Sequence, residues 1–190
     1  MSRVRIPSSA PFLYQHKYIM LIISYQGIYD GQNFESANTP DQIAKAFNNG
    51  FSVMADVWRF DDKLYVGQEN NWVEVTDRYL QGRKFWLNCQ NQDAHDYLLS
   101  LPRKLYPNVF MFSNVATEAS PAVSTGGQTI VPGTVPIDNN SIVYLPEITD
   151  RAMFSTVKLR CYGICSVYCT FIKRMRNMDA PFYGDVNIPF

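Results

Sequence analysis

The chain has 190 residues, of which 46% are hydrophobic and 18% are charged. This length fits one domain with a real core and is short for two, and the composition excludes a disordered chain. The 17 basic residues equal the 17 acidic ones, so the zero net charge predicts neither nucleic acid nor an anionic membrane as a partner. The longest apolar run, 18–25, is too short to span a membrane.

We interpret residues 1–19 as an N-terminal extension that is disordered or not part of the natural protein. Arg3 and Arg5 are followed by polar residues and prolines, without the apolar segment of a secretory signal. Val4–Ile6 also matches a translation of the T arm of a transfer RNA gene, whose terminal CCA would fall in frame at Pro11. We therefore expect Met20 to be the natural start and the source to be a bacterium or a phage. An ordinary flexible tail is the alternative.

Strands and helices alternate along a single domain, 20–178, which is typical of a parallel α/β fold. Thr39 and Pro40 form a helix start, and Asp61-Asp62 predicts a tight turn. The elements predicted in chain order are a strand at 18–26, a helix at 40–49, strands at 51–59 and 63–67, a short helix at 77–81, a strand at 84–90, a helix at 93–100, strands at 108–113 and 141–145, and a helix at 164–177. Between them, 114–140 has loop composition, and 179–190 is expected to be an extended tail.

Four motifs in the first half of the domain carry a resemblance to a known family. They are Leu21–Gly27 (LIISYQG), Asn38-Thr39-Pro40, Val53–Trp58 (VMADVW) and Lys63–Glu69 (KLYVGQE). Their order resembles the glycerophosphodiester phosphodiesterase family of phospholipase C-like phosphodiesterases, which carries His-Arg-Gly, Glu-Asn-Thr/Ser-Pro, Glu-x-Asp-Val and Gly-His-Asp at these places. Fainter likeness extends the match to about residue 170. The resemblance implies a reduced (β/α) barrel of the TIM type.

The residues that perform catalysis in that family are replaced here. The family histidines, which act as general acid and base, correspond to Tyr25 and Gln68. The phosphate-binding Arg and Lys correspond to Gln26 and Gln90, and two metal-binding glutamates correspond to Ala37 and Met54. A carboxamide does not titrate near neutral pH, and a tyrosine is a poor base there. His16 precedes the first strand and His95 lies in a predicted helix, so neither replaces the lost pair.

We therefore predict a catalytically degenerate phosphodiesterase-like protein that serves as a binding or structural module. Asp56 is the one acid that clearly remains, with Glu147 as a candidate second acid. One alternative is a metal-dependent phosphodiester hydrolase of weak or altered activity that uses Asp56, Glu69 and Glu147. Another is a decaying gene product, although the intact apolar pattern argues for a protein still required to fold.

On such a barrel the functional residues gather at the C-terminal ends of the strands. The residues expected at this rim are polar and almost uncharged: Gln26, Asn38, Asp56, Gln68, Glu69, Asn88, Gln90, Asn91 and Glu147. They suit hydrogen bonds to a neutral polyol or sugar, and the alternative is the relaxed remainder of a dead site. No cofactor is expected, and a weak Ca²⁺ or Mg²⁺ site on Asp56 and Glu147 is the alternative. The partner is left open between a polar small molecule and another protein.

The cysteines suggest packing and not metal binding. Cys161, Cys165 and Cys169 recur every four residues, which predicts one face of the final helix, and they lack the paired spacing of zinc sites. Cys89 on a strand suits the same role. Free buried thiols fit a reducing, cytoplasmic location.

Overall fold

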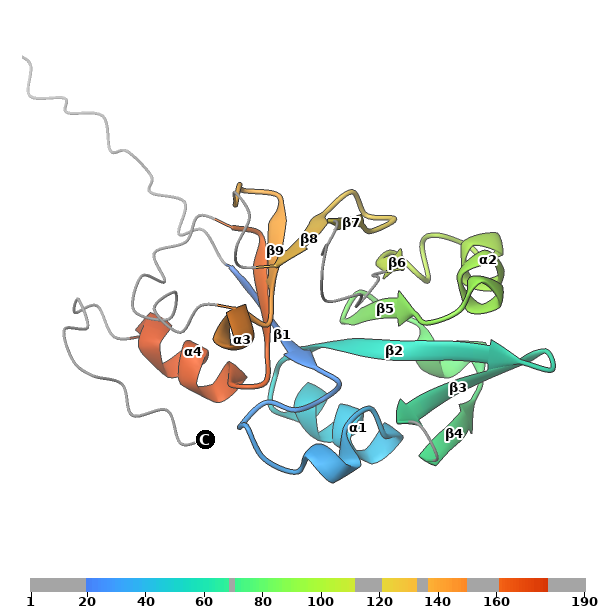
Figure 1. Cartoon of the computed structure of the whole chain (residues 1–190), viewed down its shortest axis with the longest axis horizontal. Helices are drawn as coiled ribbons and strands as arrows, with labels where there is room; N and C mark the ends of the chain where they lie inside the picture. Colours follow the sequence, from blue (N-terminus) through green and yellow to red (C-terminus); the bar gives the residue numbers. More distant parts are fainter. Residues whose placement is uncertain (1–19, 69–70, 112–120, 133–136, 150–160, 178–190) are drawn as a thin grey trace, which may run out of the picture.

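The computed structural model describes residues 20–68, 71–111, 121–132, 137–149 and 161–177. It is a mixed α/β structure with one ten-stranded sheet (Figure 1), so the predicted α/β class is confirmed. The predicted extension at 1–19, the tail at 179–190 and Glu69 lie outside the described residues. Among the described residues, no helix is long and apolar enough to cross a membrane.

The strands and helices have the following bounds. The strands are β1 (Leu21–Tyr25), β2 (Ser52–Phe60), β3 (Lys63–Gln68), β4 (Asn71–Val75), β5 (Phe85–Cys89), β6 (Val109–Phe110), β7 (Ala122–Val123), β8 (Thr129–Pro132), β9 (Ser141–Tyr144) and β10 (Gly163–Ser166). The α-helices are α1 (Pro40–Asn48), α2 (Gln92–Ser100), α3 (Pro146–Thr149) and α4 (Cys169–Asn177), and two 3₁₀ helices are η1 (Phe34–Ser36) and η2 (Asp77–Leu80).

Local sequence signals explain several of these boundaries. The Thr39 hydroxyl accepts a hydrogen bond from the Gln42 backbone N–H and caps α1, as predicted. Asp61 and Asp62 both have positive φ, at 48° and 63°, which a two-residue hairpin turn requires. This turn joins β2 to β3, and β4 then adds a third antiparallel strand.

Most of the sheet is parallel. From β1 the strands that come next in the chain lie on one side, and the strands from the end of the domain lie on the other. On one side β1 pairs with β2, β2 with β5 and β5 with β6. On the other side β1 pairs with β10, β10 with β9 and β9 with β8, all in parallel, while β7 adds antiparallel to β8. Among the described residues this ladder does not close, because β6 pairs only with β5.

The two open edges of the sheet nevertheless meet. The Thr125 backbone N–H, in the turn between β7 and β8, donates to the Val109 carbonyl of β6 at 2.8 Å. The Thr125 hydroxyl accepts from the Val109 N–H and donates to the Pro107 carbonyl. Figure 1 shows the curved path of the strands that brings these edges together.

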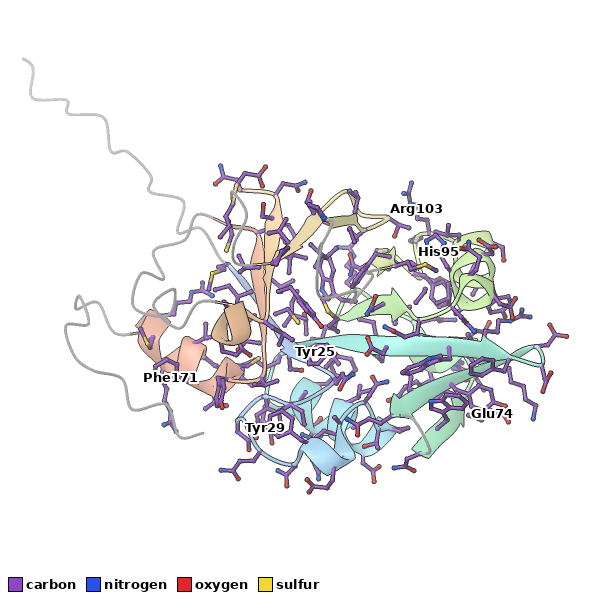
Figure 2. All side chains as sticks on the ribbon, in the orientation of Figure 1. Tyr25, Tyr29, Glu74, His95, Arg103 and Phe171 are labelled. Carbon is purple, nitrogen blue, oxygen red and sulfur yellow. The ribbon has the colours of Figure 1, made fainter. Side chains whose placement is uncertain are left out.

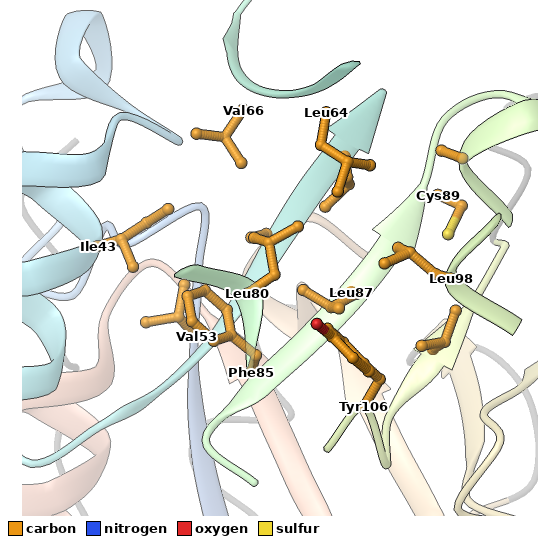
Figure 3. Packing of buried hydrophobic residues seen from close by; sticks show 14 of the residues in the cluster. Ile43, Val53, Leu64, Val66, Leu80, Phe85, Leu87, Cys89, Leu98 and Tyr106 are labelled. Carbon is orange, nitrogen blue, oxygen red and sulfur yellow. The ribbon is translucent and has the colours of Figure 1, made fainter. Parts of the chain in front are cut away.

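The sheet separates two sets of buried side chains. One inner cluster takes a single residue from each of eight strands: Ile23, Met54, Trp86, Phe110, Ala122, Ile130, Ile142 and Cys165. On the outer face, Ile43 and Ala46 of α1 and Leu98 of α2 pack on β2 and β5 (Figure 3), and Ile172 of α4 packs near β9 and β10. In the part of the chain that the structure describes, α1, α2 and α4 thus cover one face of the sheet, and the side chains of the other face pack against one another.

The prediction of one helix at 164–177 is wrong. Residues 163–166 form β10, which pairs with β1 and β9, and α4 begins at Cys169. Cys161, Cys165 and Cys169 therefore lie before a strand, in it and at the start of a helix, and not on one helix face. All four cysteines are free and buried, as predicted. The predicted loop at 114–140 also contains β7 and β8.

Candidate functional site

The inner face of the sheet changes from apolar to polar toward the C-terminal ends of its strands. On four strands, the residue two positions after an apolar residue of the inner cluster is polar. The two residues lie on the same face, because alternate residues of a strand point to the same side. These pairs are Ile23 and Tyr25 on β1, Met54 and Asp56 on β2, Trp86 and Asn88 on β5, and Ile142 and Tyr144 on β9. The parallel strands thus collect polar groups at one edge, as the sequence predicted for part of the rim.

Asp56 is the centre of this polar cluster. Its side chain is buried, and both carboxyl oxygens accept hydrogen bonds: Oδ2 from Gln26 Nε2 at 2.7 Å and Oδ1 from Asn88 Nδ2 at 2.8 Å. Gln90 approaches the same carboxyl, but its buried Nε2 has no hydrogen-bond partner among the described residues. Burial raises the pKa of Asp56 above its ordinary value, and the amide donors offset part of that effect.

Asn38 fixes the backbone beside this carboxyl. Its Nδ2 donates to the carbonyls of Asp56 and Gly67, at 2.7 and 2.9 Å, and its Oδ1 accepts from the Asp56 N–H at 3.1 Å. The side chain is fully buried. One carboxamide therefore satisfies three buried backbone groups of β2 and β3, which otherwise would have no strand partner at this point.

Two residues of the cluster have unusual backbone conformations. Gln26 has φ of 52° and Asn38 has φ of 61°, both in the left-handed region. Such a conformation costs about 1 kcal/mol or more for a residue other than glycine, and it gathers at functional sites. The Gln26 N–H bonds to the Met54 carbonyl and its C=O accepts from the Asn38 N–H, so both backbones are held in place.

Tyr25 and Tyr144 close the cluster on the other side of β1. Their rings meet edge to face with centroids 5.5 Å apart. Burial, followed by the charge of Asp56, raises the pKa of Tyr25 far above its ordinary value. Burial likewise raises the pKa of Tyr144. Neither hydroxyl can act as a base at neutral pH. Tyr25 is labelled at the end of β1 in Figure 2.

The other predicted rim residues are placed apart from Asp56. Glu147 is buried, and its Oε1 accepts hydrogen bonds from the Val167 N–H at 2.8 Å and the Ser166 hydroxyl at 3.1 Å. Its Oε2 has no partner among the described residues, and burial raises its pKa. Gln68 is exposed and donates to the carbonyl of Phe34. The structure thus brings Gln26, Asn38, Asp56 and Asn88 together. Gln68 and Glu147 form hydrogen bonds with other residues.

Asn91, also expected at the rim, lies elsewhere, and His95 lies in a helix as predicted. Asn91 caps α2 through the Ala94 N–H and exchanges hydrogen bonds with the backbone of Arg59, which gives it a structural role. His95 lies on α2 in the outer layer (Figure 2). The described residues include no group of three or more His, Cys, Asp or Glu side chains placed to hold a metal ion.

The sequence analysis missed one surface beside this cluster. Trp58, Phe60, Tyr65 and Trp72 form a group of contacting rings on β2, β3 and β4. The signal was present, because Trp58 and Phe60 are alternate residues that continue the face of Asp56. It was overlooked because β4, which carries Trp72, was not predicted.

Comparison with known proteins gives little guidance. No family profile matches the chain, and no solved structure matches it. One curated protein, the argininosuccinate lyase of Bacillus cytotoxicus (strain DSM 22905 / CIP 110041 / 391-98 / NVH 391-98), is 24% identical over 100 residues. That match covers 52% of this chain and 21% of the lyase, so the chain spans about a fifth of the length of that relative. These comparisons place the chain in no family.

Proposed function

We propose that this chain is a reduced (β/α) barrel of the glycerophosphodiester phosphodiesterase type that has lost catalysis and serves as a binding or structural module. Two features support the barrel. Eight strands each contribute one side chain to a single inner cluster, which a flat sheet of that width would keep apart. The last parallel strand also pairs with the first, as in a closed barrel, and Thr125 links the remaining edges.

The barrel has a direct test in Thr125. A Thr125→Val substitution removes the hydroxyl that bonds to Pro107 and Val109, and we expect a loss of about 1 to 2 kcal/mol in unfolding free energy. Thr125→Ser keeps the hydroxyl and is the matched control. Hydrogen exchange should also speed up at the Val109 amide in the valine variant only. Unchanged exchange there would argue that the two edges do not meet in solution.

The loss of catalysis rests chiefly on the surroundings of Asp56. Its two oxygens are occupied by the carboxamides of Gln26 and Asn88, which stay neutral at all accessible pH values. Phosphodiester hydrolysis needs groups that move a proton and cations that balance the charge of the phosphate. A carboxamide can donate a hydrogen bond to a developing negative charge but supplies neither of these. The free buried cysteines support a cytoplasmic location for the module.

The first experiment measures hydrolysis by the purified full chain. A chromogenic phosphodiester and glycerophosphocholine are offered with Ca²⁺, Mg²⁺ or Mn²⁺, beside an Asp56→Asn variant. We expect no turnover above the blank from folded protein with any ion. Metal-dependent turnover that disappears in the Asp56 variant would instead establish the alternative, a weak hydrolase built on Asp56 and nearby acids.

A further inference from the structure

Four aromatic side chains form one exposed face on the antiparallel extension of the sheet. We call Trp58, Phe60, Tyr65 and Trp72 the aromatic face. Phe60 and Trp72 are stacked with centroids 4.9 Å apart, and Trp72 also lies 6.0 Å from Trp58 and 6.5 Å from Tyr65. Trp72 is 44% exposed and Phe60 is 37% exposed. Large aromatic rings that contact each other and remain in water are typical of binding surfaces.

The strand register places all four rings on the same side of the sheet. Trp58 and Phe60 alternate on β2, Tyr65 is the cross-strand partner of Trp58, and Trp72 is the partner of Gly67, two residues after Tyr65. Gly67 has no side chain to separate the strands, and a Cβ there would lie 2.2 Å from the Asn71 carbonyl oxygen. The glycine therefore permits the close β3–β4 pairing that brings Trp72 to the other rings.

The opposite side of β2 and β3 carries buried residues, and that of β4 is half-buried. Leu64 and Val66 of β3 pack with Val57 of β2 in the outer cluster that α1 and α2 cover. The extension is thus a fixed part of the fold, and its exposed rings are held on a rigid support. A rigid support lowers the entropy that a binding surface loses when it takes up a ligand.

The aromatic face continues the polar cluster. Met54, Asp56, Trp58 and Phe60 are alternate residues of one strand, so the side of β2 that carries Asp56 also carries the first two rings. Asn38 joins Asp56 to Gly67 through its hydrogen bonds, which sets β3 directly beside the cluster. A ligand on the aromatic face therefore lies next to the carboxamides of this edge.

The cations beside the aromatic face are paired with acids, and the acids outnumber them. Lys63 and Glu74, the charged residues on the same side, pair with each other at 2.8 Å. Arg59, on β2 between Trp58 and Phe60, pairs with Asp62 and Asp93. Single-stranded nucleic acid requires a basic groove beside stacking rings, and these cations are already neutralised. The surface therefore offers no free cation to an anionic ligand, which favours a ligand without negative charge.

We propose that the aromatic face binds a neutral oligosaccharide. A hexose ring presents a flat side of C–H groups, which stacks on an indole or a phenyl ring, and a rim of hydroxyls that donate and accept hydrogen bonds. The contacting rings supply the stacking surface. The Lys63–Glu74 pair, whose members are both exposed, supplies a donor and acceptors at its border (Figure 2 labels Glu74). This inference names the ligand class of the binding module that we propose above.

The test titrates the full chain with neutral hexasaccharides, namely cellohexaose, xylohexaose, maltohexaose and laminarihexaose, by calorimetry and by tryptophan fluorescence. We expect at least one to bind, with an affinity about tenfold weaker in Trp72→Ala, because tenfold is about 1.4 kcal/mol, which is within the range of an aromatic ring contact. Phe60→Ala should weaken binding in the same direction. Tyr162→Ala is the matched control, since Tyr162 is also an aromatic residue 37% exposed but precedes β10 at the other end of the strands.

Three results would overturn this proposal. The first is that no hexasaccharide binds at millimolar concentration. The second is that a hexasaccharide binds equally well to the Trp72→Ala variant. The third is that oligothymidylate or a second copy of the chain occupies the aromatic face instead. Light scattering detects the second copy, and the Trp72 variant shows whether the face is responsible. The hydrolysis assay fails or succeeds independently, because it measures turnover at Asp56 and not affinity at Trp72.

Discussion

The inner side of β2 carries two surfaces of opposite kind within a few residues. At Asp56 the side chains are polar, buried and bonded to one another, whereas at Phe60 and across to Trp72 they are aromatic and open to water. The polar cluster occupies the positions at which the family resemblance implies chemistry. Its hydrogen bonds are nonetheless used internally, and the surface available to a ligand is the apolar one beside it.

This contrast teaches that polarity at the edge of a sheet is a weak marker of function on its own. A carboxylate serves a substrate when the substrate can reach it, and Asp56 is buried with each oxygen already bonded to an amide. An exposed aromatic ring is different, because a ligand that covers it removes its apolar surface from water and gains binding free energy. The predictions below test whether the polar cluster is structural and the aromatic face is not.

The largest effect is expected from two tryptophan substitutions compared with each other. Trp86 is 1% exposed in the inner cluster, and Trp86→Ala should lower the unfolding free energy by about 3 to 5 kcal/mol. Trp72→Ala should lower it by less than about 1 kcal/mol, because the ring is partly in water already. Urea denaturation followed by circular dichroism measures both. Equal losses in unfolding free energy would mean that the aromatic face is a second hydrophobic core. Its rings would then already be buried by the fold and would not form a binding surface.

The next effect concerns the carboxamide that joins β2 to β3. Asn38→Gly keeps the left-handed backbone without strain but leaves the Asp56 and Gly67 carbonyls without their donor. We expect a loss of about 2 to 3 kcal/mol in unfolding free energy. Asn49→Ala is the control, because the exposed Asn49 amide bonds only to the Lys45 carbonyl at the end of α1. A loss no greater than the control would show that water replaces Asn38 readily.

The outline of the fold was predictable wherever the signal is local. The Thr39 cap, the Asp61-Asp62 turn and the apolar strands each depend on neighbouring residues, and the structure contains them. Residues 163–166 have no such signal, since a short apolar run suits a strand or a helix equally. Their strand state depends on pairing with β1, far away in the chain, and this pairing separates β10 from α4.

The candidate site was predictable in part of its membership but not in its bonding. Placing Gln26, Asp56 and Asn88 at strand ends was enough to expect them together, because parallel strands end at one edge. Glu147 was expected with them and instead bonds to Val167 and Ser166, because α3 turns it toward the end of β10. The partners of such a side chain depend on how the helices pack on the sheet, and the periodicity of the sequence does not predict this packing.

The smallest effect is the most specific to the cluster, because it depends on pH. Burial raises the pKa of Asp56 above its ordinary 3.8, so between that pH and the folded-state value the folded chain keeps a proton that the unfolded chain releases. The stabilising contribution of Asp56 is therefore complete below the unfolded pKa and is lost as pH rises through the folded pKa. Above it, the folded state holds a buried charge that neutral amides only partly compensate.

Asp56→Asn removes this buried charge and should stabilise the protein by on the order of 1 kcal/mol near pH 8, with a smaller difference near pH 5. The new carboxamide can still accept from Asn88, and it can donate to Gln26 once the Gln26 amide is turned over. Urea denaturation at several pH values measures the difference between the two proteins, and Glu147→Gln shows how much another buried acid contributes. A variant that is destabilised at every pH would mean that the carboxylate holds the cluster together through its hydrogen bonds to Gln26 and Asn88, and that its buried charge has no net cost.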